Sequence, residues 1–168
     1  MNPTMTITKL DAAKKQLETA IRLYFNDADS ISIHTLACAA HEVLCSINKK
    51  RGNHPTIMSD HLIKEPHKKM FREMLNEAKN FFKHADKDPD AVVEFNPETN
   101  EYYLLDACET YEILTGEKYP HFIIFRGWFC SKYSHILSSS AGPIVKNKYG
   151  NNKMEFYSQM LSVSSGLT

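Results

Sequence analysis

The sequence of 168 residues lacks any apolar run as long as the roughly 20 residues that cross a membrane. Its first 15 residues, MNPTMTITKLDAAKK, contain no apolar core of a secretion signal. These two absences predict a cytoplasmic protein with no membrane partner. The four cysteines form no CxxC pair, so we expect thiols rather than disulfides or a structural zinc site of the usual kind.

Net charge is also absent, since 20 basic residues balance 20 acidic ones. The molecule as a whole therefore has no field that would attract nucleic acid or a membrane. The charge is nevertheless uneven. Residues 49–72 carry seven basic and two acidic side chains, whereas residues 86–117 carry ten acidic and one basic. Either these segments are solvated faces that attract each other, or the basic segment is a patch that faces RNA.

Alternation typical of strands is scarce, and helical spacing of apolar residues dominates the sequence. The pattern predicts five helices, over residues 9–25, 30–50, 66–85, 97–116 and 120–136, with Asn96 as the cap of the fourth. Thr8 and Asp11 approximate a capping box at the first helix. Pro66 favours the start of the third helix, and Gly116 favours the end of the fourth.

The predicted fold class is all-α. We expect a single helical bundle of four to five helices in residues 1–140. Residues 141–168 are expected to form a polar C-terminal tail with a short amphipathic segment, MEFYSQMLSV, that either docks or frays.

A stripe of His34, Cys38, His41 and Cys45 follows the second predicted helix at positions i, i+4, i+7 and i+11. Thiols and neutral imidazoles bind metals, but four ligands over three turns cannot share one ion, so a metal would need ligands from another helix. The alternative is a buried seam of small apolar thiols and hydrogen-bonded imidazoles. This alternative is favoured, and no metal and no cofactor are predicted.

A second polar stripe, Glu73, Glu77, Asn80 and His84, follows the third predicted helix with the same spacing. His84 falls in the last turn, where the helix dipole favours a protonated imidazole. A histidine there can act as an acid or a base near neutral pH. Alternatively, it only caps the last carbonyl groups.

The stretch KNFFKH, residues 79–84, is similar to the R-N-x-x-x-H signature of the HEPN superfamily. These small all-helical domains occur in many prokaryotic toxin and defence ribonucleases. Asn80 and His84 match the signature, while Lys79 stands where the catalytic residues of the family include arginine. The plan of the chain from Leu10 to Ile136 also looks like such a domain.

The resemblance implies RNA cleavage without a metal, usually by dimers that pool two motifs in one cleft. A ribose 2′-hydroxyl would attack the neighbouring phosphate, with His84 supporting proton transfer. Lys79 would hold phosphate charge, although lysine offers a point charge where arginine offers a planar fork. Residues five apart on a regular helix also point about 140° apart. Many HEPN-like domains have lost the signature and serve in binding or dimerisation.

We therefore predict a non-catalytic HEPN-like interaction or dimerisation module of a bacterial toxin or defence system, present as a homodimer with RNA or a protein as partner. The alternative is a metal-independent endoribonuclease that uses His84 with Asn80 and Lys79. Its phosphate-binding residues would be Arg126, Lys49, Lys50 and Arg51. A third hypothesis is a metal-binding helical bundle that uses His34, Cys38 and His41.

Overall fold

The computed structural model describes residues 4–53, 55–56, 58, 64–84, 88–134 and 151–165. Within these ranges the chain is helical and contains no strand. Its elements are α1 (Lys9–Phe25), α2 (Ser30–Lys50), the 3₁₀ turn η2 (Glu65–His67), α3 (Lys68–Phe81), α4 (Thr99–Thr115), α5 (Pro120–Lys132) and α7 (Lys153–Ser165). The predicted all-α class is confirmed. The described ranges hold six α-helices, whereas four to five were predicted.

The first two helices have the predicted bounds because their capping residues act as expected. The Thr8 hydroxyl accepts a hydrogen bond from the Asp11 N–H at 3.1 Å, and the Asp11 carboxylate accepts one from the Thr8 N–H at 3.1 Å. This is a complete capping box. At the start of α2, the Asp29 carboxylate accepts a hydrogen bond from the Ser32 N–H at 2.7 Å.

The third helix is shorter than predicted. Pro66 lies in a 3₁₀ turn before α3, and α3 ends at Phe81. His84 therefore follows the helix instead of lying in its last turn, although its backbone N–H still donates to the Asn80 carbonyl at 3.0 Å. Ala85, the predicted end, lies outside the described residues. The helix therefore ends earlier than the apolar pattern indicates.

The fourth helix begins at Thr99, two residues later than predicted. The Asn96 side chain accepts a hydrogen bond from the Glu98 N–H at 3.0 Å, which forms a turn before the helix rather than a helix cap. Its end is as predicted, because Gly116 adopts the left-handed conformation with φ of 70° and its N–H donates to the Glu112 carbonyl.

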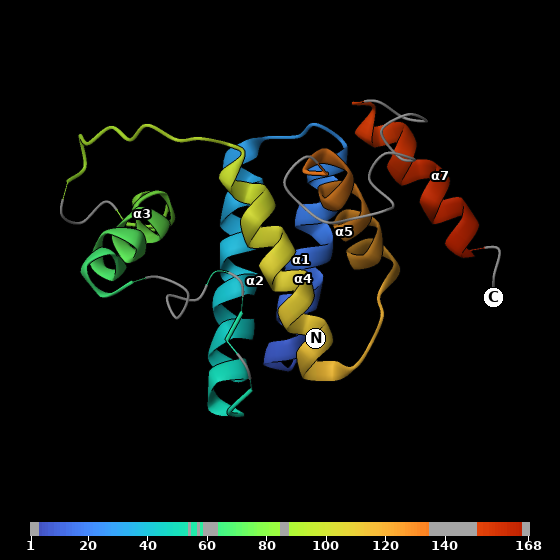
Figure 1. The fold of residues 1–168 in the computed structure, drawn as a ribbon, viewed down its shortest axis with the longest axis horizontal. Helices are drawn as coiled ribbons and strands as arrows, with labels where there is room; N and C mark the ends of the chain where they lie inside the picture. Colours follow the sequence, from blue (N-terminus) through green and yellow to red (C-terminus); the bar gives the residue numbers. More distant parts are fainter. Residues whose placement is uncertain are drawn as a thin grey trace.

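Four helices, α1, α2, α4 and α5, lie side by side and form the centre of the molecule (Figure 1). Its largest fully buried apolar side chains are Phe25, Phe125, Leu17, Ile21, Leu44 and Leu104. The helix α3 stands on the outer side of α2, at the end of an extended arm that leads to α4 (Figure 1). The polar side chains described below lie in two places. One is the contact between α2 and α4, and the other is the space between α3 and these two helices.

The amphipathic segment near the C-terminus docks on the bundle as α7, on the side of α5 (Figure 1). Phe156 and Tyr157 are buried there. The Tyr157 ring stacks on Phe25 with centroids 4.3 Å apart, and the Phe156 ring packs on Trp128 at 5.4 Å. These contacts make α7 part of the core. The domain boundary predicted at residue 140 lies outside the described residues.

By length and composition, α2 is a helix that could cross a membrane, the one such helix in the described ranges. The central helix of a soluble bundle meets the same criteria. In this fold α2 packs between α1 and α4 and buries the polar side chains of His34 and Asn48. The predicted cytoplasmic location stays a prediction.

Candidate metal centre

The predicted stripe on α2 divides into two histidine–cysteine pairs. In each pair the cysteine follows the histidine by four residues, so the two side chains lie one above the other on the helix. The distance from Sγ to Nε2 is 3.3 Å in both the His34–Cys38 pair and the His41–Cys45 pair. Each pair faces one polar residue of α4, Asn100 for the first and Asp106 for the second. All four cysteines are free thiols.

The first pair forms a closed chain of hydrogen bonds. The Asn100 amide donates to the Ser30 carbonyl at 3.0 Å, which leaves its oxygen to accept from Nδ1–H of His34 at 2.8 Å. Nε2 of His34 is then the acceptor for the Cys38 thiol. This connectivity resembles that of a cysteine–histidine–asparagine triad.

Burial makes the first pair inert. His34 is only 2% exposed and Cys38 only 1% exposed. Burial lowers the pKa of His34 and raises the pKa of the Cys38 thiol to about 12. A neutral thiol is a poor nucleophile and a poor metal ligand. The first pair therefore acts as a buried structural contact whose polar groups are hydrogen-bonded.

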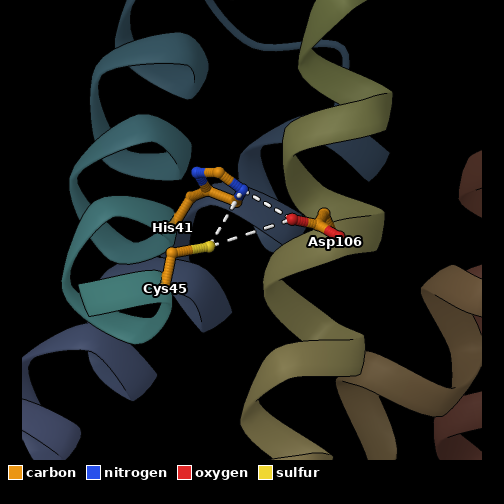
Figure 2. Close-up of side chains that lie close together, drawn as sticks. All are labelled: His41, Cys45 and Asp106. Carbon is orange, nitrogen blue, oxygen red and sulfur yellow. Dashed lines mark hydrogen bonds and ion pairs between the residues drawn. The ribbon is translucent and has the colours of Figure 1, made fainter. Parts of the chain in front are cut away.

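The second pair has a different geometry. Nε2 of His41 lies 2.7 Å from Oδ2 of Asp106 and 3.3 Å from Sγ of Cys45. The sulfur also lies 3.9 Å from the same carboxylate oxygen. Figure 2 shows the three side chains pointing toward one another from α2 and α4. One nitrogen, one sulfur and one oxygen thus lie within 4.8 Å of one another.

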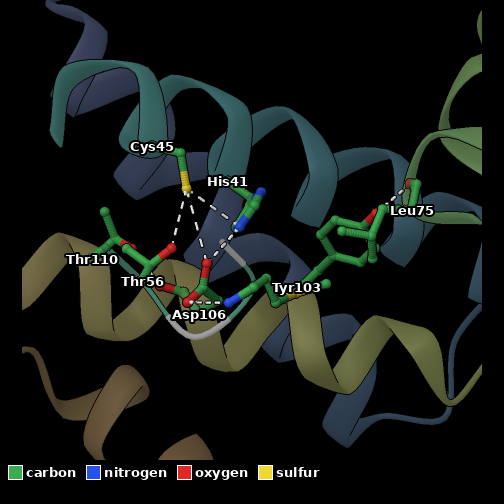
Figure 3. A network of polar contacts seen from close by, with 8 residues as sticks. His41, Cys45, Thr56, Leu75, Tyr103, Asp106 and Thr110 are labelled. Carbon is green, nitrogen blue, oxygen red and sulfur yellow. Dashed lines mark hydrogen bonds and ion pairs between the residues drawn. The ribbon is translucent and has the colours of Figure 1, made fainter. Parts of the chain in front are cut away.

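The carboxylate of Asp106 is held in place from several directions (Figure 3). Its side chain is fully buried, and its second oxygen accepts a hydrogen bond from the Met58 N–H at 3.3 Å. The Thr56 hydroxyl lies 3.9 Å from Sγ of Cys45, and the Thr110 hydroxyl donates within α4 to the backbone carbonyl of Asp106 at 2.7 Å, not to its carboxylate. Such outer contacts orient the ligands of metal sites.

Electrostatics couple His41 to Asp106. Burial opposes a charge on His41, but hydrogen bonds to Asp106 and Cys45 outweigh this effect and raise the pKa of His41 to about 9. Burial also opposes a charge on Asp106, yet the hydrogen bond from His41 keeps the pKa of that carboxyl below its ordinary value. At neutral pH the metal-free site therefore contains an imidazolium–carboxylate pair.

The donor atoms of the second cluster are of the types that bind a metal ion, but their arrangement does not suit a proton relay. In a relay, the nucleophile and the carboxylate use opposite nitrogens of the imidazole ring, whereas here both approach Nε2 of His41. Ligand atoms around tetrahedral zinc lie roughly 3.3–3.7 Å apart, given metal–ligand bonds of about 2.0–2.3 Å. The nitrogen–sulfur separation of 3.3 Å lies in this range, whereas the nitrogen–oxygen contact of 2.7 Å would have to lengthen and the sulfur–oxygen separation of 3.9 Å would have to shorten slightly.

The structure brings together other residues than the three that the sequence-based metal hypothesis named. His34, Cys38 and His41 do not converge, because the first two belong to the inert pair. Asp106 was missed. The available signal was a single carboxylate within the apolar stretch YYLLDAC of the fourth helix, where it would be buried.

Two of the three predicted ribonuclease residues lie together. His84 and Asn80 are exposed and line one hollow of about 580 Å³, which also has Glu77 and Asp88 in its wall. Lys79 does not line this hollow. Its ammonium lies 3.5 Å from the Glu42 carboxylate of α2.

The predicted phosphate-binding residues lie elsewhere and do not line the hollow around His84. Arg126 on α5 is held between two carboxylates of α4, with 2.7 Å from its Nε to Glu109 and a second bond to Glu112. Lys49, Lys50 and Arg51 are exposed at the C-terminal end of α2. The Arg51 guanidinium donates to the Leu114 carbonyl at 3.0 Å.

Comparison of the chain with protein-family models, curated proteins and solved structures gave no match.

Proposed function

We propose that this protein is a metal-binding helical bundle that holds one ion of the zinc class between α2 and α4. The ligands would be Nε2 of His41, Sγ of Cys45 and Oδ2 of Asp106. The observation that supports this proposal is the convergence of three different donor atoms within 4.8 Å of one another. Nitrogen, sulfur and carboxylate oxygen are the three ligand types that zinc accepts in proteins. The proposal departs from the expectation of no metal.

Metal binding would replace the contact between the imidazolium and the carboxylate. The proton on Nε2 of His41 and the proton on the Cys45 thiol would leave, because both atoms must donate an electron pair. Asp106 already presents a carboxylate, which the Met58 N–H keeps oriented. Three protein ligands leave one position of a tetrahedron for water or a small ligand, as in catalytic rather than structural zinc sites.

The test is a zinc titration of protein that has been freed of metal by a chelator under reducing conditions. We expect one zinc ion per chain by elemental analysis after dialysis. Cys45→Ser and His41→Ala should lose the ion, whereas the matched variant Cys38→Ser, changed one pair away on the same helix, should keep it. Equal retention by Cys45→Ser and Cys38→Ser, with helicity intact, would contradict the proposal.

A metal-independent endoribonuclease is a second proposal, favoured by the shared hollow of exposed His84 and Asn80. Because Lys79 is paired with Glu42, phosphate charge would have to be held by another cation, for example from a second copy of the chain. In an RNA cleavage assay with chelator, His84→Ala should abolish cleavage, and the exposed His67→Ala should not. Equal rates for both variants would eliminate this proposal.

The HEPN-like interaction or dimerisation module stays a prediction. Its dimerisation form predicts a homodimer, so the mass of the protein in solution is the first measurement to make. A monomer at micromolar concentration would argue against it.

A further inference from the structure

A second cavity, of about 520 Å³, lies between α3 and the bundle. One wall is formed by α3, and the others by α2, α4 and the arm that joins α3 to α4. The residues that matter most for its chemistry are Phe95, Tyr102, Tyr103, Glu77 and Glu94. Its volume falls in the range of sites for small organic molecules.

The aromatic wall of this cavity is fixed in place. The Tyr103 hydroxyl donates to the Leu75 carbonyl of α3, and its ring stands edge-on to His34 at 5.4 Å. The Phe95 ring stands edge-on to His34 at 5.0 Å and to Phe82 at 5.2 Å. These contacts hold the rings before any ligand arrives, which reduces the entropy cost of binding.

The charge in the wall has one sign. Glu77 and Glu94 are its charged members, and no lysine or arginine lines it. Neither carboxylate forms an ion pair or a hydrogen bond in the part of the chain that the structure describes. The two lysines near the end of α3, Lys79 and Lys83, approach Glu42 instead and do not line the cavity.

We propose that this cavity binds an organic cation, an ammonium group attached to an aromatic or apolar body. Aromatic faces attract cations through their ring quadrupole, and Trp or Tyr cages recognise ammonium ligands in this way. The two carboxylates add attraction for a positive charge and repel an anion. None of the three proposed metal ligands lines this cavity, although Met58 and Tyr103 border both sites. The two proposals are tested by different readouts, so each can fail without the other.

The test uses three probes of similar shape, 2-phenylethylammonium, 2-phenylethanol and phenylacetate, with the full chain at pH 7. A chelator is present so that the amine cannot bind as a metal ligand. By calorimetry or ligand-observed NMR, we expect the cation to bind at least about fivefold more tightly than the alcohol, and phenylacetate to bind most weakly. Equal binding of all three probes, or binding of none, would overturn the proposal.

Three variants locate the effect. Glu77→Gln and Glu94→Gln should each weaken binding of the cation about fivefold and leave binding of the alcohol unchanged. Glu73→Gln is the matched control, because Glu73 is an exposed carboxylate of α3 that does not line this cavity. If Glu73→Gln weakens the cation as much as the other two variants do, the attraction comes from general surface charge and the proposal is wrong.

Discussion

The two histidine–cysteine pairs of α2 have the same spacing and the same Sγ–Nε2 distance, yet their chemistry differs. The difference comes from α4. Asn100 contacts Nδ1 of His34, the nitrogen opposite the thiol, so the first pair is a neutral chain of hydrogen bonds. Asp106 contacts Nε2 of His41, the same nitrogen that the thiol approaches. In the second pair the nitrogen, the sulfur and the carboxylate oxygen therefore point toward one place.

Exposure reinforces this difference. His41 is partly exposed, whereas His34 is buried. An ion can therefore reach the second pair more readily than the first. The comparison shows that residue type and spacing on one helix do not define a metal site. The site is defined by which imidazole nitrogen the polar residue of α4 contacts.

The largest effect is expected from removing the two partners on α4. Asp106→Ala leaves an imidazolium without its counterion in a mostly buried site, and we expect a loss of about 3–5 kcal/mol in the free energy of unfolding at pH 7. Asn100→Ala leaves neutral groups unsatisfied and should cost about 1–3 kcal/mol. Urea denaturation of metal-free protein measures both. If Asp106→Ala and Asn100→Ala lower the free energy of unfolding by the same amount, the contact between His41 and Asp106 is not an ion pair.

The two histidines should affect stability in opposite pH ranges. The pKa of His41 is about 9 in the folded protein, above its ordinary 6.5, so its stabilisation is complete below pH 6.5 and is lost between pH 6.5 and 9. This loss is at most about 3 kcal/mol. The pKa of His34 is lowered, so its contribution is present above pH 6.5 and is lost at lower pH.

Urea midpoints from pH 5 to 9, measured with chelator, test these two slopes. Asp106→Asn should remove most of the loss above pH 6.5 and keep the loss below it. NMR titration of the imidazole C–H resonances gives the assignment, with His41 titrating above pH 6.5 and His34 below. Titration of both rings at one pH would contradict the comparison.

A smaller and more selective effect is expected from Asn100→Asp, which gives the first pair the same residue types as the second. The new carboxylate should raise the pKa of His34 toward its ordinary value, because a carboxylate beside Nδ1 favours the imidazolium. It should not create a second zinc site, because residue 100 contacts Nδ1 while Cys38 contacts Nε2. Two zinc ions per chain in this variant would show that convergence on one nitrogen is not required.

Local chemistry explains why the sequence predicts some parts of the fold well. The bounds of α1 and α2 follow from Thr8, Asp11 and Asp29, whose side chains bond to backbone groups three residues away. The overlong prediction for α3 came from apolar spacing that continues past the last helical residue. The position of α3 outside α2 depends on long-range contacts such as Tyr103 with Leu75, which no local pattern encodes.

The candidate metal centre could be predicted only in part for the same reason. The spacing of His41 and Cys45 is visible in the sequence, and so is the need for a ligand from another helix. The identity of that ligand depends on how α4 packs on α2, which places Asp106 opposite one pair and Asn100 opposite the other. The choice between Nδ1 and Nε2 is likewise a property of packing and leaves no trace in the sequence.

The most direct test of the central claim is a cobalt titration of reduced, metal-free protein at pH 8, followed by absorption spectroscopy. A bound Co²⁺ with a thiolate ligand gives a sulfur-to-cobalt charge-transfer band in the near ultraviolet. We predict that this band saturates at one equivalent, persists in Cys38→Ser and disappears in Cys45→Ser. No band in the parent protein, or equal bands in the two variants, would contradict the account.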